Sequence, residues 1–245
     1  MHYVMSDLHG QYFAFEAMLK KIGFTSDDFL YIAGDVVDRG PNPVALLMRI
    51  LYSPNMVLLI GNHEHMMLDV MKKQANGSAW AMNGCETTLD DLARFPKTIT
   101  DDLFARLERC PLQLSHITVG AREFCISHTG PSPKYTGDIP VYSEAEPEAV
   151  KSLTQSRLNA DEPQKAYREL LQAGLPKETV VLFGHTPVQL LSYGKTEPDT
   201  GQGMITKADG VPFYDLDCGC AGGFTPGCLC LETMQEYYLL EESMS

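Results

Sequence analysis

The sequence predicts an α/β fold built around parallel strands. Its N-terminal half alternates short apolar runs with stretches whose apolar residues recur at helical spacing, which is the pattern of consecutive βαβ units. The runs Phe29–Ala33, Met56–Ile60 and Val180–Phe183 are continuously apolar, as expected for strands that are covered on both faces. A chain of 245 residues is long enough to bury a sizeable core within one domain.

The first elements follow one another closely along the chain. Tyr3–Met5 is expected to be a strand, and Gln11–Ile22 is expected to be a helix because its apolar residues recur at i, i+3, i+4 and i+7. Asn42 is expected to cap a second helix that has proline at its first position. A third helix is expected to begin near His63 and to bury four apolar residues, Met66, Met67, Val70 and Met71.

The middle of the chain is expected to be mainly helical and its end β-rich. Residues 77–111 are expected to form a helical cap segment, in which Thr100 is one N-cap. A β-hairpin and then a polar helical region are expected over Leu112–Val119 with Arg122–His128, and over Glu144–Ala173. A second hairpin is expected around Gly222–Gly227, with a last strand near Tyr237–Leu240.

Composition and charge narrow the classes of function. The net charge of −13 argues against binding nucleic acid or an anionic membrane surface by electrostatic attraction. No apolar stretch is long enough to span a membrane, and no basic segment followed by an apolar core marks a secretory signal. Seven cysteines without an export signal are expected to be reduced thiols in a cytoplasmic protein. Because no repeat or linker interrupts the pattern, residues 1–245 are expected to form a single domain.

Polar residues that can bind metal recur where the predicted strands end. Five motifs each follow directly on an apolar run: Ser6-Asp7-Leu8-His9-Gly10, Gly34-Asp35-Val36-Val37-Asp38-Arg39-Gly40, Gly61-Asn62-His63-Glu64, Ser127-His128 and Gly184-His185-Thr186-Pro187. Ligands of open α/β sheets bind outside the carboxyl ends of the strands, so these motifs should meet at one edge. Carboxylate, amide oxygen and imidazole nitrogen suit divalent ions such as Mn, Fe and Zn. Two such ions about 4 Å apart are a common means of cleaving phosphate esters.

The residue types divide into two metal sites that share one carboxylate. Strand alternation would send Asp7 and His9 to the same side, where one ion could take both. Asp35 could bridge two ions through its two oxygens. One amide oxygen and two imidazole nitrogens could complete the second ion, those of Asn62, His128 and His185.

This set of motifs resembles that of the calcineurin-like metallophosphoesterases, and within them the phosphoprotein-phosphatase branch. That branch carries Asp-x-His-Gly, Gly-Asp-x-x-Asp-Arg-Gly, Gly-Asn-His-Glu, a lone His and Gly-His-Thr-Pro in this order, and all five are present between about Tyr3 and Leu240. The resemblance implies a four-layer α/β sandwich, in which helices flank two mixed sheets. It also implies a hydrolase that uses two divalent ions, with Mn favoured over Fe or Zn, and a metal-bridging hydroxide as nucleophile.

The resemblance further implies roles at single positions. The first ion would be bound by Asp7, His9 and Asp35, and the second by Asp35, Asn62, His128 and His185. His63 would protonate the leaving group, with Asp38 as its carboxylate partner. Arg39 and Asn62 would bind the substrate phosphate. Two departures stand out. Ile60 replaces an arginine that phage and eukaryotic members usually have, and a Trp-containing segment with a second phosphate-binding arginine is missing, for which Arg157 is the nearest candidate.

Two groups within the branch resemble different parts of this chain, and they imply different classes of substrate. The segment Trp80-Ala-Met-Asn83-Gly84 looks like that of small bacteriophage-type and bacterial serine/threonine protein phosphatases. The tail over 216–223 and 228–231 is similar to that of symmetrical diadenosine tetraphosphatases, which more often have Asp in place of Glu64. Because the motifs have few cations near them, we favour a phosphorylated protein or small phosphoester over a bis(5'-nucleosyl)-tetraphosphate. An inactive metal-binding scaffold is a second alternative, which the complete set of ligand residues argues against.

Four of the cysteines form two Cys-x-Cys pairs, Cys218 with Cys220 and Cys228 with Cys230. Strand alternation places both sulfurs of a pair on one face, so the two pairs could together form a zinc site. Small buried thiols also pack well in a core, and packing is the interpretation that we favour.

Overall fold

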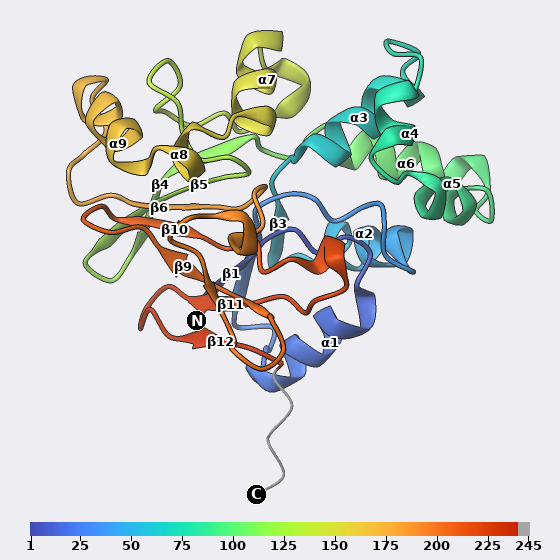
Figure 1. Ribbon diagram of the computed structural model, residues 1–245. Helices are drawn as coiled ribbons and strands as arrows, with labels where there is room; N and C mark the ends of the chain where they lie inside the picture. Colours follow the sequence, from blue (N-terminus) through green and yellow to red (C-terminus); the bar gives the residue numbers. More distant parts are fainter. Residues whose placement is uncertain (240–245) are drawn as a thin grey trace, which may run out of the picture.

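Two five-stranded mixed sheets lie face to face in the computed structural model, which describes residues 1–239 (Figure 1). Helices cover the outer face of each sheet, so the layers run helix, sheet, sheet, helix. The expected four-layer α/β sandwich is therefore confirmed.

The first sheet contains the βαβ units of the N-terminal half. Its strands lie in the order β12-β11-β1-β2-β3, where β1, β2 and β3 are parallel and β11 runs antiparallel to its two neighbours. The strands span His2–Met5 (β1), Phe29–Ile32 (β2), Met56–Leu58 (β3), Cys228–Cys230 (β11) and Glu236–Tyr237 (β12). The C-terminal ends of the three parallel strands therefore lie at one edge of this sheet.

The second sheet has the order β4-β5-β6-β10-β9. Its strands span Gln113–Val119 (β4), Arg122–Ser127 (β5), Val180–Phe183 (β6), Thr206–Lys207 (β9) and Phe213–Asp215 (β10). The expected hairpin is formed by β4 and β5, while β6 pairs in parallel with β5 and β10. A separate two-stranded ribbon joins β7 (Lys195–Thr196) to β8 (Gly203–Met204).

The helices fall into three groups. The first sheet is covered by α1 (Tyr12–Lys21), α2 (Pro43–Leu51) and α3 (Asn62–Met71), and α7 (Pro147–Gln155) packs against α3. The second sheet is covered by α8 (Leu158–Asp161) and α9 (Pro163–Gln172). The segment 77–111 holds α4 (Ser78–Met82), α5 (Glu86–Leu92) and α6 (Lys97–Leu107), of which α5 and α6 contact α2. Short 3₁₀ turns occur at Tyr142–Glu144, Val188–Leu190 and Cys220–Gly222.

Alternate residues of the central strands serve two different cores. Tyr3 and Met5 of β1 pack beneath the helices of the first sheet, whereas Val4 packs between the two sheets. In β5 the arrangement is mirrored, since Phe124 faces the other sheet and Cys125 packs against α8 and α9. Strands with apolar neighbours on both faces need continuous apolar runs, which is why those runs identified them in the sequence.

Several expectations for individual elements were wrong. Thr100 does not cap a helix, because α6 already begins at Lys97, directly after Pro96. Met71 ends α3 with 43% of its surface exposed, so it belongs to no core. By contrast, Asn42 is the N-cap of α2 and proline follows at the start of the helix, as expected, although the Asn42 side chain makes no capping hydrogen bond.

The expected hairpin around 222–227 is also wrong. This segment connects β10 of the second sheet to β11 of the first, so it crosses between the layers. The hairpin lies later, where β11 pairs antiparallel with β12. The last strand ends at Tyr237, and Leu240 lies outside the described residues.

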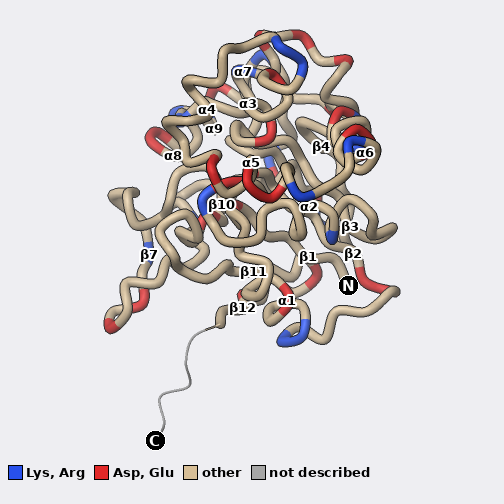
Figure 2. Tube along the Cα trace, turned by 90° about the vertical axis from the view of Figure 1, so that its right-hand side faces the viewer, with Lys and Arg blue, Asp and Glu red and all other residues tan. Residues whose placement is uncertain are grey.

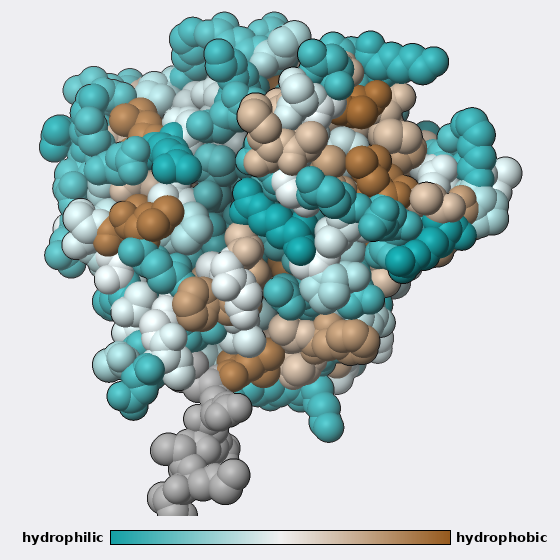
Figure 3. Space-filling view, turned by 45° about the vertical axis from the view of Figure 1, so that its right-hand side comes forward, coloured by the Kyte–Doolittle hydropathy of each residue, from teal (hydrophilic) through white to brown (hydrophobic). Residues whose placement is uncertain are grey.

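The acidic residues are spread over the surface. Figure 2 shows Asp and Glu on several helices and loops, interspersed with Lys and Arg. Figure 3 shows a mainly hydrophilic face with separate hydrophobic patches. No helix within residues 1–239 is long and apolar enough to cross a membrane.

Candidate metal centre

The predicted ligand residues meet where strands of both sheets end. They follow five strands: Asp7 and His9 after β1, Asp35 after β2, Asn62 after β3, His128 after β5 and His185 after β6. Asn62 and His185 are half-buried, and the others are buried. The strand ends therefore bring residues from positions 7 to 185 of the chain into one place.

Donor atoms form two groups that share Asp35. His9, Asp35 and His63 each place one donor within 4.8 Å of the others, and Asp35, His128 and His185 do the same. Oδ2 of Asp35 lies 3.8 Å from Nε2 of His9 and 3.4 Å from Nε2 of His128.

Asn62 adds its side-chain oxygen to the second group. Oδ1 of Asn62 lies 2.9 Å from Nε2 of His128 and 2.9 Å from Nδ1 of His185. Those two histidine nitrogens are 3.1 Å apart. The second group therefore brings one amide oxygen, two imidazole nitrogens and a shared carboxylate together.

Asp7 lies beside these groups rather than within either one. Its Oδ2 accepts hydrogen bonds from the Ser6 hydroxyl and from the His185 backbone N–H, the latter at 3.0 Å. Burial raises the pKa of Asp7, and the nearby carboxyls of Asp217 and Asp35 raise it further.

The expected alternation does not position the first motif. β1 ends at Met5, and the φ angles of Asp7 and His9 are 51° and 40°, in the left-handed region. The alternation of side chains along a strand therefore does not extend to these two residues.

Much of the centre rests on left-handed backbone. Eight non-glycine residues within 1–239 have positive φ, and six of them belong to the motifs: Asp7, His9, Asp35, Asp38, Arg39 and His185. This conformation costs about 1–2 kcal/mol for a non-glycine residue, so the surrounding contacts must hold it in place. The motif glycines serve close approach: a Cβ on Gly34 would lie 2.6 Å from Nδ1 of His128, and one on Gly61 would lie 2.2 Å from Oδ1 of Asp35.

Glu64 ties two of the strand-end loops together. Its side chain is fully buried and accepts hydrogen bonds from four backbone N–H groups. The donors are Asp35 at 2.8 Å, Val36 at 2.7 Å, Val37 at 3.2 Å and Gly61 at 3.0 Å. This one carboxylate therefore fixes the loop after β2 against the loop after β3.

The donor chemistry of the two groups fits divalent cations. Nδ1 of His128 must donate to the Ala33 carbonyl at 2.8 Å, and Nδ1 of His9 must donate to the Val37 carbonyl at 3.1 Å, because a carbonyl only accepts. In a neutral imidazole Nε2 then carries no proton, and its lone pair is available, as in histidines that bind metal. Burial is the main cause that lowers the pKa of both histidines and raises the pKa of Asp35. Facing lone pairs and buried carboxyls repel one another unless a cation lies between them.

His63 is held by a network around Asp38. Its Nδ1 lies 2.6 Å from Oδ2 of Asp38, while its Nε2 faces the centre at 3.9 Å from Oδ2 of Asp35. Asp38 is fully buried and also accepts hydrogen bonds from Trp80 and Thr88. The predicted pairing of His63 with Asp38 is therefore present in the structure.

Two arginines bring positive charge to the centre. Nη1 of Arg39 lies 3.5 Å from Nε2 of His9. Arg157 is exposed, and its charge helps to lower the pKa of His185 to about 4, after burial as the larger cause. Arg39 has a smaller effect than Arg157 on the pKa of His185, and it also lowers the pKa of His9.

Sequence reasoning missed several residues that shape the centre. Glu64 was noted only as a departure from one group of relatives, and Thr88 and Asp217 were given no role. Trp80 was used only to compare groups of relatives, although a single tryptophan in the chain could also have indicated a role near the centre. Asp217 matters because its carboxyl is one of those that raise the pKa of Asp7. Burial in turn raises the pKa of Asp217 itself to about 7.

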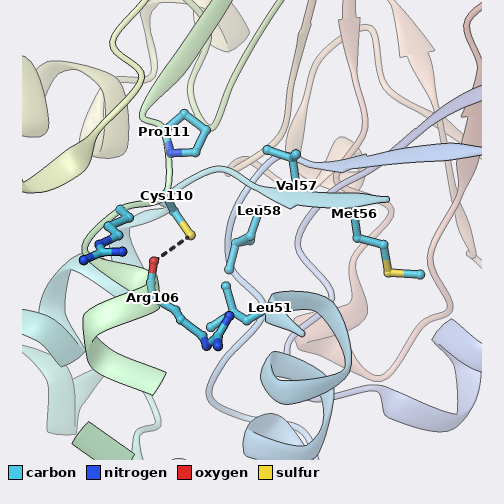
Figure 4. A pocket seen from close by; sticks show the side chains of 8 residues that line it. Leu51, Met56, Val57, Leu58, Arg106, Cys110 and Pro111 are labelled. Atoms are coloured by element: carbon cyan, nitrogen blue, oxygen red, sulfur yellow. Dashed lines mark hydrogen bonds between the residues drawn. The ribbon is translucent and has the colours of Figure 1, made fainter. Parts of the chain in front are cut away.

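Other features of the fold lie apart from this centre. The pocket in Figure 4 lies beside β3 and contains none of the predicted site residues; it is lined by Leu51, Met56, Val57, Leu58, Arg106, Arg109, Cys110 and Pro111. All seven cysteines are free and buried. Cys228 and Cys230 pack beneath the helices of the first sheet, whereas Cys218 packs between the sheets. Within residues 1–239, no group of metal donors includes sulfur.

Comparisons with known proteins show which proteins this chain is similar to. The family model for calcineurin-like phosphoesterase matches residues 3–213. A symmetrical bis(5'-nucleosyl)-tetraphosphatase of Salmonella paratyphi C is 26% identical over 274 aligned residues, which cover 96% of this chain and 93% of that protein. Serine/threonine-protein phosphatase 2 of Salmonella typhimurium is 37% identical over 83 residues, or 34% of this chain and 37% of that protein.

Several of these matches are partial, and the structural likeness shows the fold alone. Matches to three relatives at 32% to 41% identity cover only 24%, 37% and 50% of their lengths. A crystal structure classed provisionally as a diadenosine tetraphosphatase has a TM-score of 0.62 and 18% identity, covering 96% of this chain and 91% of that one. A serine/threonine phosphatase of Saccharomyces cerevisiae has a TM-score of 0.56 and 15% identity, covering 99% of this chain and 81% of that one.

Proposed function

Because this chain belongs to the calcineurin-like phosphoesterase family, we propose that it uses two divalent ions to hydrolyse a dinucleoside tetraphosphate. From the sequence alone, this substrate was the second expectation, after a phosphorylated protein or small phosphoester. The relative that aligns along 96% of this chain and 93% of its own length carries the tetraphosphatase name, and this supports the reverse order. The protein-phosphatase match covers only 34% of this chain.

The observation that supports a two-metal site is the pair of donor groups that meet at Asp35. Residues from the first motif would hold one ion together with that carboxylate, namely Asp7 and His9. The other ion would be held by Asn62, His128 and His185 on the opposite side of Asp35. When bound, such ions neutralise phosphate charge and activate water, and the mixture of oxygen and nitrogen donors suits Mn, Fe or Zn.

The residues of the chain itself supply proton transfer and phosphate binding. His63 donates through Nδ1 to Asp38 and therefore presents Nε2 to the centre, where it can deliver a proton to the leaving oxygen. Arg39 offers a planar fork of donors beside the first donor group, which suits phosphate oxygens.

The presence of two arginines favours a polyphosphate. Arg39 lies beside His9, and the exposed Arg157 is a second cation whose charge acts on His185. A monoester presents one phosphate to such a centre, whereas a tetraphosphate carries further phosphates that a second arginine would bind. Arg157 was the nearest sequence candidate for a second phosphate-binding arginine, and we propose that it has this role.

A direct comparison of substrates tests the proposal. With Mn present, kcat/KM for diadenosine tetraphosphate should exceed that for p-nitrophenyl phosphate and for phosphoserine and phosphothreonine peptides by at least a hundredfold. Symmetrical cleavage should give two molecules of ADP. A higher kcat/KM for any phosphopeptide would instead establish the protein phosphatase, and no turnover of any of these substrates would leave the inactive scaffold.

An arginine variant tests the polyphosphate site itself. A hydrogen bond to a charged group contributes about 1.5–3 kcal/mol, so Arg157→Gln should raise KM for the tetraphosphate about 10-fold to 100-fold. The KM for p-nitrophenyl phosphate should change much less. Arg168→Gln is the matched control, because Arg168 is exposed on α9 and its charge acts on Lys165 of the same helix. Equal changes for both substrates in Arg157→Gln would contradict this role.

A further inference from the structure

We propose that Trp80 and Thr88 are positioning residues for proton transfer by His63, and that they act through Asp38. Both come from the segment 77–111, which packs on α2 and α3 and forms hydrogen bonds with Asp38 and Arg39. The inference rests on the proposed function, since it assigns a task within the same reaction.

The hydrogen bonds around Asp38 fix the orientation of its carboxylate. Oδ2 accepts from Nδ1 of His63 at 2.6 Å and from Nε1 of Trp80 at 2.7 Å, and Oδ1 accepts from Oγ1 of Thr88 at 2.6 Å. The Thr88 hydroxyl in turn accepts from the Asp38 backbone N–H at 2.9 Å. The hydroxyl thus holds both the side chain and the main chain of Asp38, and a carboxylate held at both oxygens cannot rotate without losing a buried bond.

This orientation determines which nitrogen of His63 faces the reaction. An indole N–H can only donate, and so Oδ2 of Asp38 must be an acceptor toward Trp80. The same oxygen also accepts a hydrogen bond from the N–H at Nδ1 of His63, which leaves Nε2 as the atom that faces the centre. Loss of either outer bond would let the carboxylate turn, and His63 would lose its fixed direction.

The surrounding backbone needs such fastening. Asp38 and Arg39 have φ angles of 71° and 66°, each at a cost of about 1–2 kcal/mol. The segment that carries Trp80 and Thr88 also binds Arg39 directly: the Gly84 carbonyl accepts from its backbone N–H at 3.0 Å, and the Asn83 carbonyl accepts from its Nε at 3.2 Å. Residues 80–88 therefore hold both strained residues in place.

A positioning role and a purely structural role make different predictions about leaving groups. Proton donation matters most when the leaving group is a poor one and little when it departs readily as an anion. If Trp80 and Thr88 aim His63, weakening them should reduce the rate selectively on poor leaving groups. If they only stabilise the fold, the rate should fall by the same factor on every substrate.

The test uses an isosteric pair of variants at Thr88. Thr88→Val keeps the shape and removes the hydroxyl, whereas Thr88→Ser keeps the hydroxyl and removes the methyl group. Thr154→Val is the matched control, since Thr154 is equally buried and its hydroxyl donates only to the Val150 carbonyl within α7. Each Mn-loaded protein is assayed with a series of aryl phosphates, from phenyl to dinitrophenyl phosphate, and its metal content is measured.

General acid catalysis contributes typically ~10²–10⁴-fold, so Thr88→Val should lose about tenfold or more on phenyl phosphate and little on dinitrophenyl phosphate. Thr88→Ser and Thr154→Val should follow the wild type across the series, and all variants should keep their metals. Should Thr88→Val fail to fold, Trp80→Phe removes the donor to Oδ2 and is read in the same series.

Two results would overturn the inference: an equal loss on all substrates, or a loss in Thr88→Ser as large as that in Thr88→Val. A wild-type protein inactive on every phosphate substrate would refute the proposed function, and this inference with it. With an active wild type, the leaving-group series decides the inference alone.

Discussion

Glu64→Gln is the substitution that should most clearly reveal how the centre is held together. It preserves the size of the side chain but replaces one carboxylate oxygen with an NH₂ group. Glu64 now accepts from four backbone N–H groups, two at each oxygen. The variant retains one accepting oxygen, so the other pair of N–H groups would face a donor. In one orientation that pair is Val36 and Val37, and in the other it is Asp35 and Gly61.

The size of the effect follows from these two lost bonds. A hydrogen bond to a charged group contributes about 1.5–3 kcal/mol, which gives about 3–6 kcal/mol for the pair. Removing a buried negative charge offsets part of this loss, because burying a charge is itself unfavourable. We therefore expect the free energy of unfolding to fall by about 2–4 kcal/mol, which for a protein of this size lowers Tm by about 5–15 °C.

Thermal unfolding of EDTA-treated protein is the appropriate assay, because bound metal would add stability of its own. Glu123→Gln is the matched control, since Glu123 is exposed on β5, and surface substitutions usually change stability by less than about 0.5 kcal/mol. Titration with Mn should also show weaker binding to Glu64→Gln, because the loops that carry Asp35 and Asn62 would loosen. A Tm within about 1–2 °C of that of the control would refute the reasoning.

Four further expectations follow from the same structure. Asp35→Asn should reduce the occupancy of both metals as well as activity, and two fully occupied ions by elemental analysis would rule out a shared ligand. His63→Asn should keep both metals and lose about 10²–10⁴-fold on poor leaving groups but less on activated aryl phosphates, whereas equal losses would contradict proton donation. Replacing Cys228 and Cys230 together with serine should leave metal content unchanged; loss of one zinc per chain with activity retained would reveal a structural site. Burial raises the pKa of Asp35, and that of Asp217 to about 7, so the metal-free folded protein binds protons that the unfolded chain has released. For Asp217 this means that the free energy of unfolding should fall as the pH rises from about 4 to about 7. The buried histidines, whose pKa values are lowered, act in the opposite sense, so the fall is read as the difference between the wild type and Asp217→Asn in EDTA. A difference that rises over this interval would contradict the assignment.

The sequence by itself determined which runs form covered strands and which residues make up the centre, while the four layers were implied by the family that its motifs resemble. Continuous apolar runs identify strands that are covered on both faces, and a polar motif directly after such a run must lie at a strand end. Position and residue type are therefore enough to predict that Asp35, Asn62, His128 and His185 lie together. The strands come from two sheets, but the rule for each strand end is local and does not depend on which sheet the strand joins.

Only the tertiary structure decided how that centre is supported. Trp80 and Thr88 lie 42 and 50 residues from Asp38, and no periodic pattern links them to it. Glu64 belongs to a motif, but its four N–H partners depend on how two loops approach each other. The glycine-rich segment 222–227 shows the same limit, since its composition indicated a turn but not that the next strand would join the other sheet. Local sequence specifies where a strand ends, whereas contacts between distant segments form only when the layers pack, and so they are determined by the whole fold.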